Sequence, residues 1–178
     1  ALHNLGVVLL EKGNVADGKR CLLASLRLDS RYTKAYNNVG YALMAEGDLQ
    51  TAEAYFQKSR RLDPCQFETE FGLGQIMEKQ GRLSEAFSHF CAALQLRPTV
   101  AETHNFLGVV LAKQKQWIPA IRHFREATRL KPDDPLAWYN LGAALEMVGQ
   151  AQEAQICLWR ANKLGLNRDS AIMREPAK

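Results

Sequence analysis

Apolar residues recur every three or four positions in paired stretches along the chain. One stretch is marked by Ala35, Val39, Ala42 and Leu43, and the next by Ala52, Phe56, Ser59 and Leu62. This spacing places the side chains of each stretch on one face of an α-helix. Gly47 is predicted to end the first helix and Asp48 to cap the second. Pro64 then closes the unit, because proline cannot continue a helix.

The same pattern returns with a period of 34 residues, and nine of the twelve glycines follow it in two registers. These are Gly6, Gly40, Gly74, Gly108 and Gly142, and then Gly13, Gly47, Gly81 and Gly149. A second column reads Ala52, Ala86, Ala120 and Ala154, and a third reads Phe56, Phe90, Phe124 and Leu158. Small residues let paired helices approach closely, and the large column fills the space beside them. A fixed period of this length predicts helical units that stack on one another.

Ten helices are predicted. The first helices of the pairs are expected at 1–12, 34–46, 68–80, 102–114 and 136–148, and the second helices at 16–28, 50–62, 84–96, 118–130 and 152–164. Pro119 falls in the first turn of its helix, where proline is tolerated. One all-α domain over 1–166 is expected, with repeats at about 1–32, 33–66, 67–100, 101–134 and 135–166. A basic tail, 167–178, is expected to be a short helix or disordered.

These columns resemble the tetratricopeptide repeat family over residues 1 to about 166. The motifs are Leu-Gly pairs in the first helix, as in Leu73-Gly74, an aromatic four residues earlier, as in Tyr36 and Trp138, and the series Ala86, Phe90, Ala93 and Pro98. Repeat one departs from the pattern at Gly18, Ser25 and Ser30, and repeat four has Lys115 instead of its second glycine. The resemblance implies a right-handed superhelical solenoid of antiparallel helix pairs. Its first helices would line a concave groove that holds an extended peptide or a helix of a partner protein.

Ten groove positions follow from this resemblance: Asn4, Asn37, Asn38, Tyr41, Phe71, Gln75, Asn105, Phe106, Tyr139 and Asn140. An asparagine amide both donates and accepts hydrogen bonds, so it can match a peptide backbone of any sequence. The asparagines resemble the ladder in the repeat region of O-linked N-acetylglucosamine transferases, interrupted here at Gly72 and Phe106. Aromatic side chains are good anchors for a partner. The alternatives are that the asparagines only solubilise the helices, and that Phe71 and Phe106 pack between adjacent first helices.

Charge narrows the class of partner. The chain has 178 residues, 24% of them charged, and a net charge of +4, with acids and bases interleaved rather than gathered in a basic stripe. Nucleic acid is therefore not the expected ligand. The lysine, asparagine and arginine clamp of chaperone-binding family members is absent. Five predicted inner glutamates, Glu11, Glu68, Glu78, Glu102 and Glu146, face three lysines, Lys34, Lys79 and Lys113, which favours a neutral to mildly basic segment.

Chemistry-bearing motifs are missing: the sequence has no metalloprotease helix, nucleophile elbow, phosphate loop or dinucleotide fingerprint. The chain is therefore predicted to be non-catalytic and to use no cofactor. One column, Cys21, Tyr55, His89, His123 and Cys157, suggests a metal site. Equivalent residues of stacked units lie about 10 Å apart, so only His89 and His123 could approach, and no metal site is expected.

The four cysteines, Cys21, Cys65, Cys91 and Cys157, are widely spaced and form no CxxC pair. They are predicted to be free thiols in the cytoplasm. A periplasmic or membrane-anchored location is the alternative if an upstream signal was removed. No run of about 18 apolar residues is present, so no membrane span is expected.

The predicted function is a non-catalytic scaffold for protein–protein interaction. The alternatives are a docking or regulatory arm of a larger enzyme, such as a glycosyltransferase, and an architectural subunit of a bacterial surface or secretion assembly. Stacked repeats need polar caps at their ends, so self-association through uncapped ends is also predicted, with Leu158 and Trp159 as candidate contacts.

Overall fold

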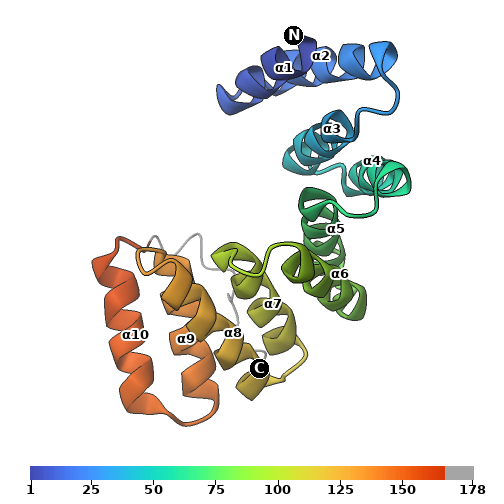
Figure 1. Ribbon diagram of the computed structural model, residues 1–178. Helices are drawn as coiled ribbons and strands as arrows, with labels where there is room; N and C mark the ends of the chain where they lie inside the picture. The colour runs from blue at the N-terminus through green and yellow to red at the C-terminus, as the bar shows by residue number, and fades with distance from the viewer. Residues whose placement is uncertain (167–178) are drawn as a thin grey trace. The chain divides into compact units, whose positions relative to one another are not determined.

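The structure is a computed structural model that describes residues 1–166, and within this range it contains ten α-helices and no strand (Figure 1). The helices are α1 (Leu2–Glu11), α2 (Val15–Leu28), α3 (Thr33–Glu46), α4 (Leu49–Leu62), α5 (Phe67–Lys79), α6 (Leu83–Leu96), α7 (Ala101–Lys113), α8 (Trp117–Leu130), α9 (Pro135–Met147) and α10 (Ala151–Lys163). Every end lies within one residue of the predicted position, and the all-α helical-repeat fold is confirmed. The predicted basic tail lies outside the described residues.

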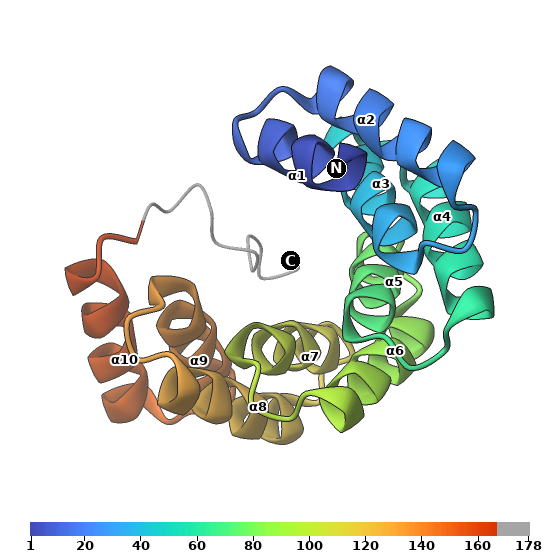
Figure 2. The ribbon, with the colours of Figure 1, turned by 45° about the horizontal axis from the view of Figure 1, so that its top comes forward.

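The chain divides into two compact units, one over Ala1–Gln80 and one from Gly81 onward, and each is described by itself. In unit 1, α1 pairs with α2 and α3 with α4, and α3 also packs on α1, α2 and α5. In unit 2, α7 pairs with α8 and α9 with α10, while α9 also packs on α7 and α8 (Figures 1 and 2). Within each unit the first helices therefore touch one another as well as their own partners.

The glycine column sets how closely the paired helices approach. Phe56 is fully buried against the backbone of α3, and a Cβ added at Gly40 would lie 2.7 Å from its ring. Phe124 lies in the same way on Gly108, at 2.6 Å. Both distances are shorter than a carbon–carbon contact allows, so only glycine leaves room for the ring. This confirms the predicted fit of a small column against a large one.

The turns between paired helices use the second glycine register. Gly13, Gly47, Gly81 and Gly149 all have φ between 74° and 84°. This left-handed conformation strains residues that carry a Cβ. Lys115, which replaces glycine in repeat four, adopts it too, at φ 60°. The sequence departure is therefore accommodated without a change of turn.

Other local predictions have mixed outcomes. The Asp48 side chain accepts a hydrogen bond from the Thr51 amide at 3.0 Å, so it caps α4 as predicted. Pro119 lies in the first turn of α8. The leucine that ends each second-helix stripe is not a core residue: Leu28 and Leu96 are exposed and Leu62 is half-buried. Each of these three leucines is the last residue of its helix.

Candidate peptide-binding face

Four of the ten predicted groove residues are interior residues: Asn37, Phe71, Asn105 and Asn140. Asn37 donates to Gln66 Oε1 at 3.0 Å and accepts from the Thr69 hydroxyl at 2.8 Å. Thr69 lies on the neighbouring first helix, α5, so this network joins α3 to α5. Its atoms serve the packing between helices and are not available at a surface.

Asn105 and Asn140 make the corresponding link in unit 2. The Asn140 amide nitrogen on α9 donates to Asn105 Oδ1 on α7 at 3.0 Å, and both side chains are buried. This bond satisfies the Asn140 amide nitrogen and links the two first helices, while Asn140 Oδ1 is buried without a hydrogen-bond partner among the described residues. The interpretation of these asparagines as groove contacts is thus wrong for Asn37, Asn105 and Asn140, and so is the alternative that they solubilise the helices.

The remaining asparagines meet at the surface of unit 1. His3 on α1 lies between them: the Asn38 amide nitrogen contacts His3 Nε2 at 3.0 Å, and His3 Nδ1 contacts Asn4 Oδ1 at 3.2 Å. Because an amide nitrogen only donates, Nε2 accepts and the imidazole proton is on Nδ1. The Tyr32 ring packs edge-on against His3, with 4.8 Å between ring centroids. The three polar side chains are therefore held in place by one another.

Tyr41 and Gln75 occupy one register position on the next two first helices. The Tyr41 hydroxyl donates to the Glu68 carbonyl oxygen at 2.8 Å, and its ring meets Phe56 edge-on at 5.0 Å. Gln75 on α5 is half-buried. Within residues 1–166, the Asn4 amide nitrogen, the Asn38 oxygen and the Gln75 amide have no hydrogen-bond partner. We call these three residues, Asn4, Asn38 and Gln75, the amide face.

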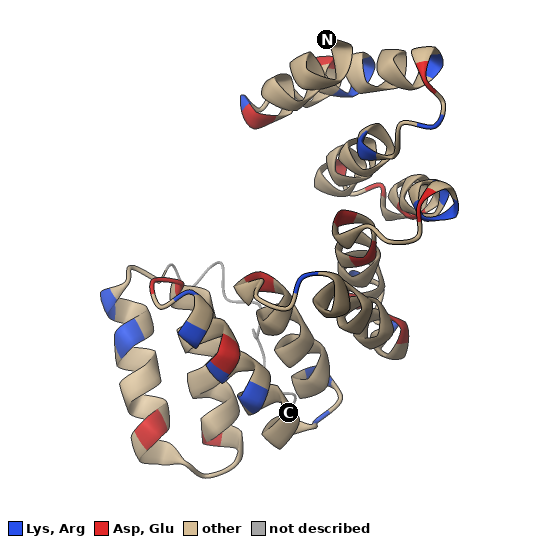
Figure 3. Cartoon of the chain, viewed as in Figure 1, with Lys and Arg blue, Asp and Glu red and all other residues tan. Residues whose placement is uncertain are grey.

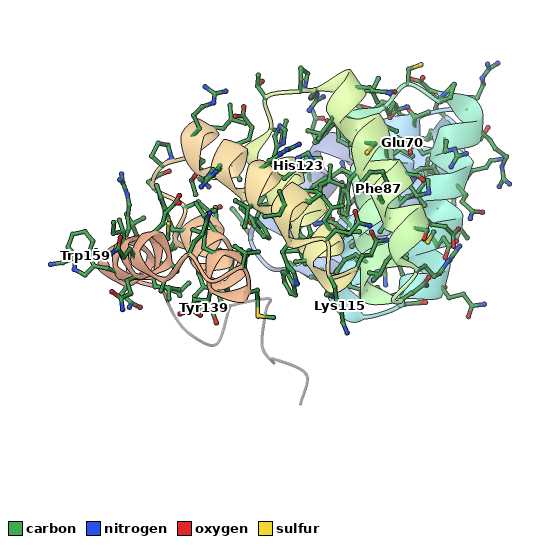
Figure 4. All side chains as sticks on the ribbon, turned by 90° about the horizontal axis from the view of Figure 1, so that it is seen from below. Glu70, Phe87, Lys115, His123, Tyr139 and Trp159 are labelled. Atoms are coloured by element: carbon green, nitrogen blue, oxygen red, sulfur yellow. The ribbon has the colours of Figure 1, made fainter. Side chains whose placement is uncertain are left out.

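In unit 2 the two aromatic candidates differ. Phe106 on α7 stacks on the buried Phe90 of α6, with 5.5 Å between centroids, so in this stack its ring contacts a second helix and not an adjacent first helix. In unit 1, the candidate Phe71 stacks on Phe67 of the same helix, α5. Tyr139 is half-buried on α9 and is labelled in Figure 4. Tyr139 is therefore the candidate aromatic of this unit that is not taken up by ring stacking.

Acidic and basic residues are interspersed on both units (Figure 3). Glu78, one of the predicted inner acids, is buried and does not add to a surface charge. Glu46 on α3 is paired with Lys19 of α2 at 2.5 Å. The expected negative surplus of the first helices is thus smaller than the sequence suggests.

One of the two histidines of the candidate metal column, His123, pairs with a residue of its own repeat. His123 on α8 lies beside His104 on α7, with their Nδ1 atoms 3.2 Å apart. His104 Nε2 lies 3.0 Å from the Pro98 carbonyl oxygen, which only accepts, so His123 Nδ1 donates to His104 Nδ1. Burial lowers the pKa of His123, and the charge of His104 lowers it further. Across residues 1–166, no three His, Cys, Asp or Glu side chains gather in a metal-binding arrangement.

Sequence reasoning missed that the residue four positions before the repeat glycine is a structural hydrogen-bond donor in three of the repeats. Three such residues contact the carbonyl oxygen six positions earlier: Tyr36 with Ser30, His104 with Pro98, and Trp138 with Pro132. A donor at this register was visible in the sequence as tyrosine, histidine and tryptophan. The carbonyl that accepts its proton was not, because backbone geometry decides that partner.

None of the helices within residues 1–166 combines the length and apolarity needed to cross a lipid bilayer. All four cysteines are free, and Cys157 is buried, which raises the pKa of its thiol.

Two family models match the chain. Residues 3–65 match the model described as tetratricopeptide repeat, and residues 111–149 match the one described as TPR repeat. Together the two matches cover more than half of the 178 residues. Comparison with curated proteins returns no match.

Solved structures share the fold at low sequence identity. PilF of Pseudomonas aeruginosa is 21% identical with a TM-score of 0.86, over 93% of this chain and 76% of that one. MamA from residue 41 to the end, of Desulfovibrio magneticus RS-1, is 22% identical with a TM-score of 0.81, over 95% and 96%. YrrB, described as a TPR protein with an unusual peptide-binding site, is 20% identical with a TM-score of 0.74, over 94% and 87%. With its period, its helix pairs and these matches, the chain belongs to the tetratricopeptide repeat family.

Proposed function

We propose that the chain is a non-catalytic protein-interaction module whose amide face binds an extended segment of a partner protein. The observation that carries this proposal is the set of unpartnered amide atoms on three neighbouring first helices. Asn4 offers a donor, Asn38 an acceptor and Gln75 both. A peptide backbone has the same two kinds of group, so it can be bound without regard to its side chains.

The side chains around the amide face are held in place before a peptide binds, which supports the proposal. His3 holds Asn4 and Asn38 in place, and the bond from Tyr41 to the Glu68 carbonyl oxygen fixes the tyrosine, which shares the register of Gln75. Side chains that are already ordered lose less conformational entropy when a ligand binds. The Tyr41 ring would add apolar contact at the same place. At the level of fold alone, the likeness to YrrB supports a peptide as the ligand.

The proposed partner segment is neutral to mildly basic. The first helices of unit 1 carry Glu11, Lys34, Glu46 and Lys79 as exposed charges, two of each sign. A strongly acidic segment would therefore find no net counter-charge on these helices. Tyr139 on α9 is the position in unit 2 that we assign to partner contact.

A quantitative binding measurement tests this function. A partner is first captured from cells, and its binding segment is made as a synthetic peptide and titrated by calorimetry. Replacing Asn4, Asn38 and Gln75 together with alanine is expected to weaken binding about 10-fold or more, since each lost hydrogen bond is worth about 0.5–1.5 kcal/mol. The control is Gln50→Ala on α4, an exposed amide away from this face. Equal affinity of the triple variant and wild type would contradict the proposal.

Self-association is a second proposed interaction, and α1 is the surface that supports it. Leu5 is 50% exposed and Val8 is 43% exposed. The residues at the same two registers of the other repeats are all buried: Val39, Leu73, Leu107 and Leu141, and Ala42, Ile76, Val110 and Ala144. Of the predicted contacts, Trp159 projects from α10 and is exposed, whereas Leu158 packs on Gly142 (Figure 4).

A further inference from the structure

We propose that unit 1 has a second binding site, in the groove between α2 and α4, for an acidic peptide segment with an apolar side chain between its carboxylates. This inference goes beyond the peptide-binding function proposed above, because the groove is built mainly from second helices. The amide face lies on first helices and shares no residue with it.

The groove is a cavity of about 430 Å³. It is lined by Leu23, Leu26 and Arg27 of α2, Tyr36 of α3, and Ala54, Tyr55 and Lys58 of α4. Tyr36 forms part of the lining and is fixed by its hydrogen bond to the Ser30 carbonyl oxygen, with its ring 6.0 Å from that of Tyr55. A volume of this size falls in the range of ligand pockets and holds one or two side chains of a peptide.

The corresponding place in unit 2 is bridged by protein side chains. Three repeats after Tyr36 stands Trp138, and the Arg160 guanidinium, at the register of Lys58, lies 4.5 Å from the Trp138 ring. Arg125 of α8 also reaches Glu153 of α10 at 2.9 Å. In unit 1 the residues at these last two registers are Leu23 and Thr51, which cannot form an ion pair. The groove between α2 and α4 in unit 1 is thus open, whereas an ion pair bridges the corresponding helices α8 and α10 in unit 2.

The charges of the groove have one sign. Arg27 and Lys58 both line it, both are exposed, and neither has an ion-pair partner within residues 1–166. No acidic residue lines the cavity. An unpaired arginine favours a carboxylate, which its guanidinium can bind through two parallel hydrogen bonds. Leu23, Leu26 and Ala54 supply an apolar wall, so a leucine or phenylalanine beside the carboxylates completes the match.

The site can be tested with a fluorescein-labelled peptide of sequence Glu-Glu-Leu-Glu-Phe-Glu-Glu, measured by fluorescence anisotropy with the full chain. We expect Arg27→Glu combined with Lys58→Glu to weaken binding about tenfold or more, because two attractive charges become repulsive. Ala54→Trp, which fills the groove without a change of charge, is expected to weaken it as much. Circular dichroism establishes that each variant is folded.

The control variant is Lys12→Glu combined with Lys131→Glu, which changes net charge equally at exposed cations outside the groove. It should bind within about twofold of wild type. The amide-face triple alanine variant should also bind normally, which separates this site from the proposed function. No binding by wild type, an equal loss in the control, or full binding by Ala54→Trp would each overturn the proposal.

Discussion

The absence of a Cβ at the repeat glycines decides how closely the paired helices of this protein pack. The ring of Phe124 occupies the volume that a Cβ on Gly108 would need, and the ring of Phe56 does the same at Gly40 and at Gly72. A fully buried phenylalanine contributes about 1.5–3 kcal/mol through removal of its surface from water. The glycine column is therefore kept for packing, although glycine weakens a helix.

Replacing Gly108 with alanine is expected to destabilise the protein by about 1–3 kcal/mol. The added methyl group would lie 2.6 Å from Phe124, and this clash outweighs the better helix propensity of alanine. Urea unfolding followed by circular dichroism measures the change. In a Phe124→Ala background the same substitution should become neutral or stabilising. A destabilisation of equal size in both backgrounds would show that the ring is not the cause.

Lys115 presents the opposite case, a side chain where glycine is preferred. Its φ of 60° costs about 1–2 kcal/mol relative to an unstrained residue, and glycine avoids that cost. Lys115→Gly is expected to raise the free energy of unfolding by up to about 1 kcal/mol, since the greater freedom of glycine in the unfolded chain offsets part of the gain. Gln114→Gly, at a φ of −83°, should lower it. Thermal unfolding of both variants makes the comparison.

At the scale of helices, the sequence predicted every helix end to within one residue, because a 34-residue period repeats each cap and each stripe five times. The candidate site was less predictable. Asn37 and Asn38 are neighbours in sequence, yet successive residues of a helix point about 100° apart. Asn37 therefore joins α3 to α5 in the interior, while Asn38 reaches His3 at the surface. Which neighbour faces inward depends on partners from other repeats, such as Thr69, that no local pattern identifies.

The contact between α7 and α8 is expected to weaken in acid. Burial lowers the pKa of His123 below its ordinary value of 6.5, so the unfolded chain binds this proton more readily than the folded one. The contribution to stability is present above about pH 6.5 and is lost as the pH falls below it. The added proton goes to His123 Nε2, because Nδ1 already donates to His104, so the cost of protonation lies in burying the charge.

The test replaces His123 with tyrosine, the residue that Tyr55 provides at the same register in unit 1. Urea unfolding of wild type and variant is compared between about pH 7.5 and pH 5. The free energy of unfolding of wild type should fall more steeply with acid than that of the variant. Parallel curves would show that the histidine pair does not couple folding to pH.

At the scale of the whole molecule, the two units use one repeat for different contacts. Unit 1 carries the amide face, the open groove and the exposed Leu5 and Val8, whereas unit 2 pairs its asparagines internally and bridges α8 to α10. Of the described residues, those proposed to meet partners therefore lie mainly in the first 80 residues. The repeat explains the fold, and the substitutions within it explain where binding is proposed.

Self-association through α1 predicts a concentration-dependent mass. Leu5→Glu combined with Val8→Glu should shift sedimentation toward the monomer, because two half-exposed apolar side chains become charged and like charges would meet. Ile118→Glu on α8, another exposed apolar residue, serves as the control and should leave association unchanged. A wild-type mass that stays monomeric across all concentrations would rule this contact out.

The most direct measurement of peptide binding on the amide face follows the side-chain amide signals of Asn4, Asn38 and Gln75 by nuclear magnetic resonance while partner peptide is added. If a backbone pairs with these groups, their signals should shift together and saturate at the affinity found by calorimetry, while the signal of Gln50 stays in place. If the peptide binds to saturation while these three signals do not move, peptide binding on the amide face is contradicted.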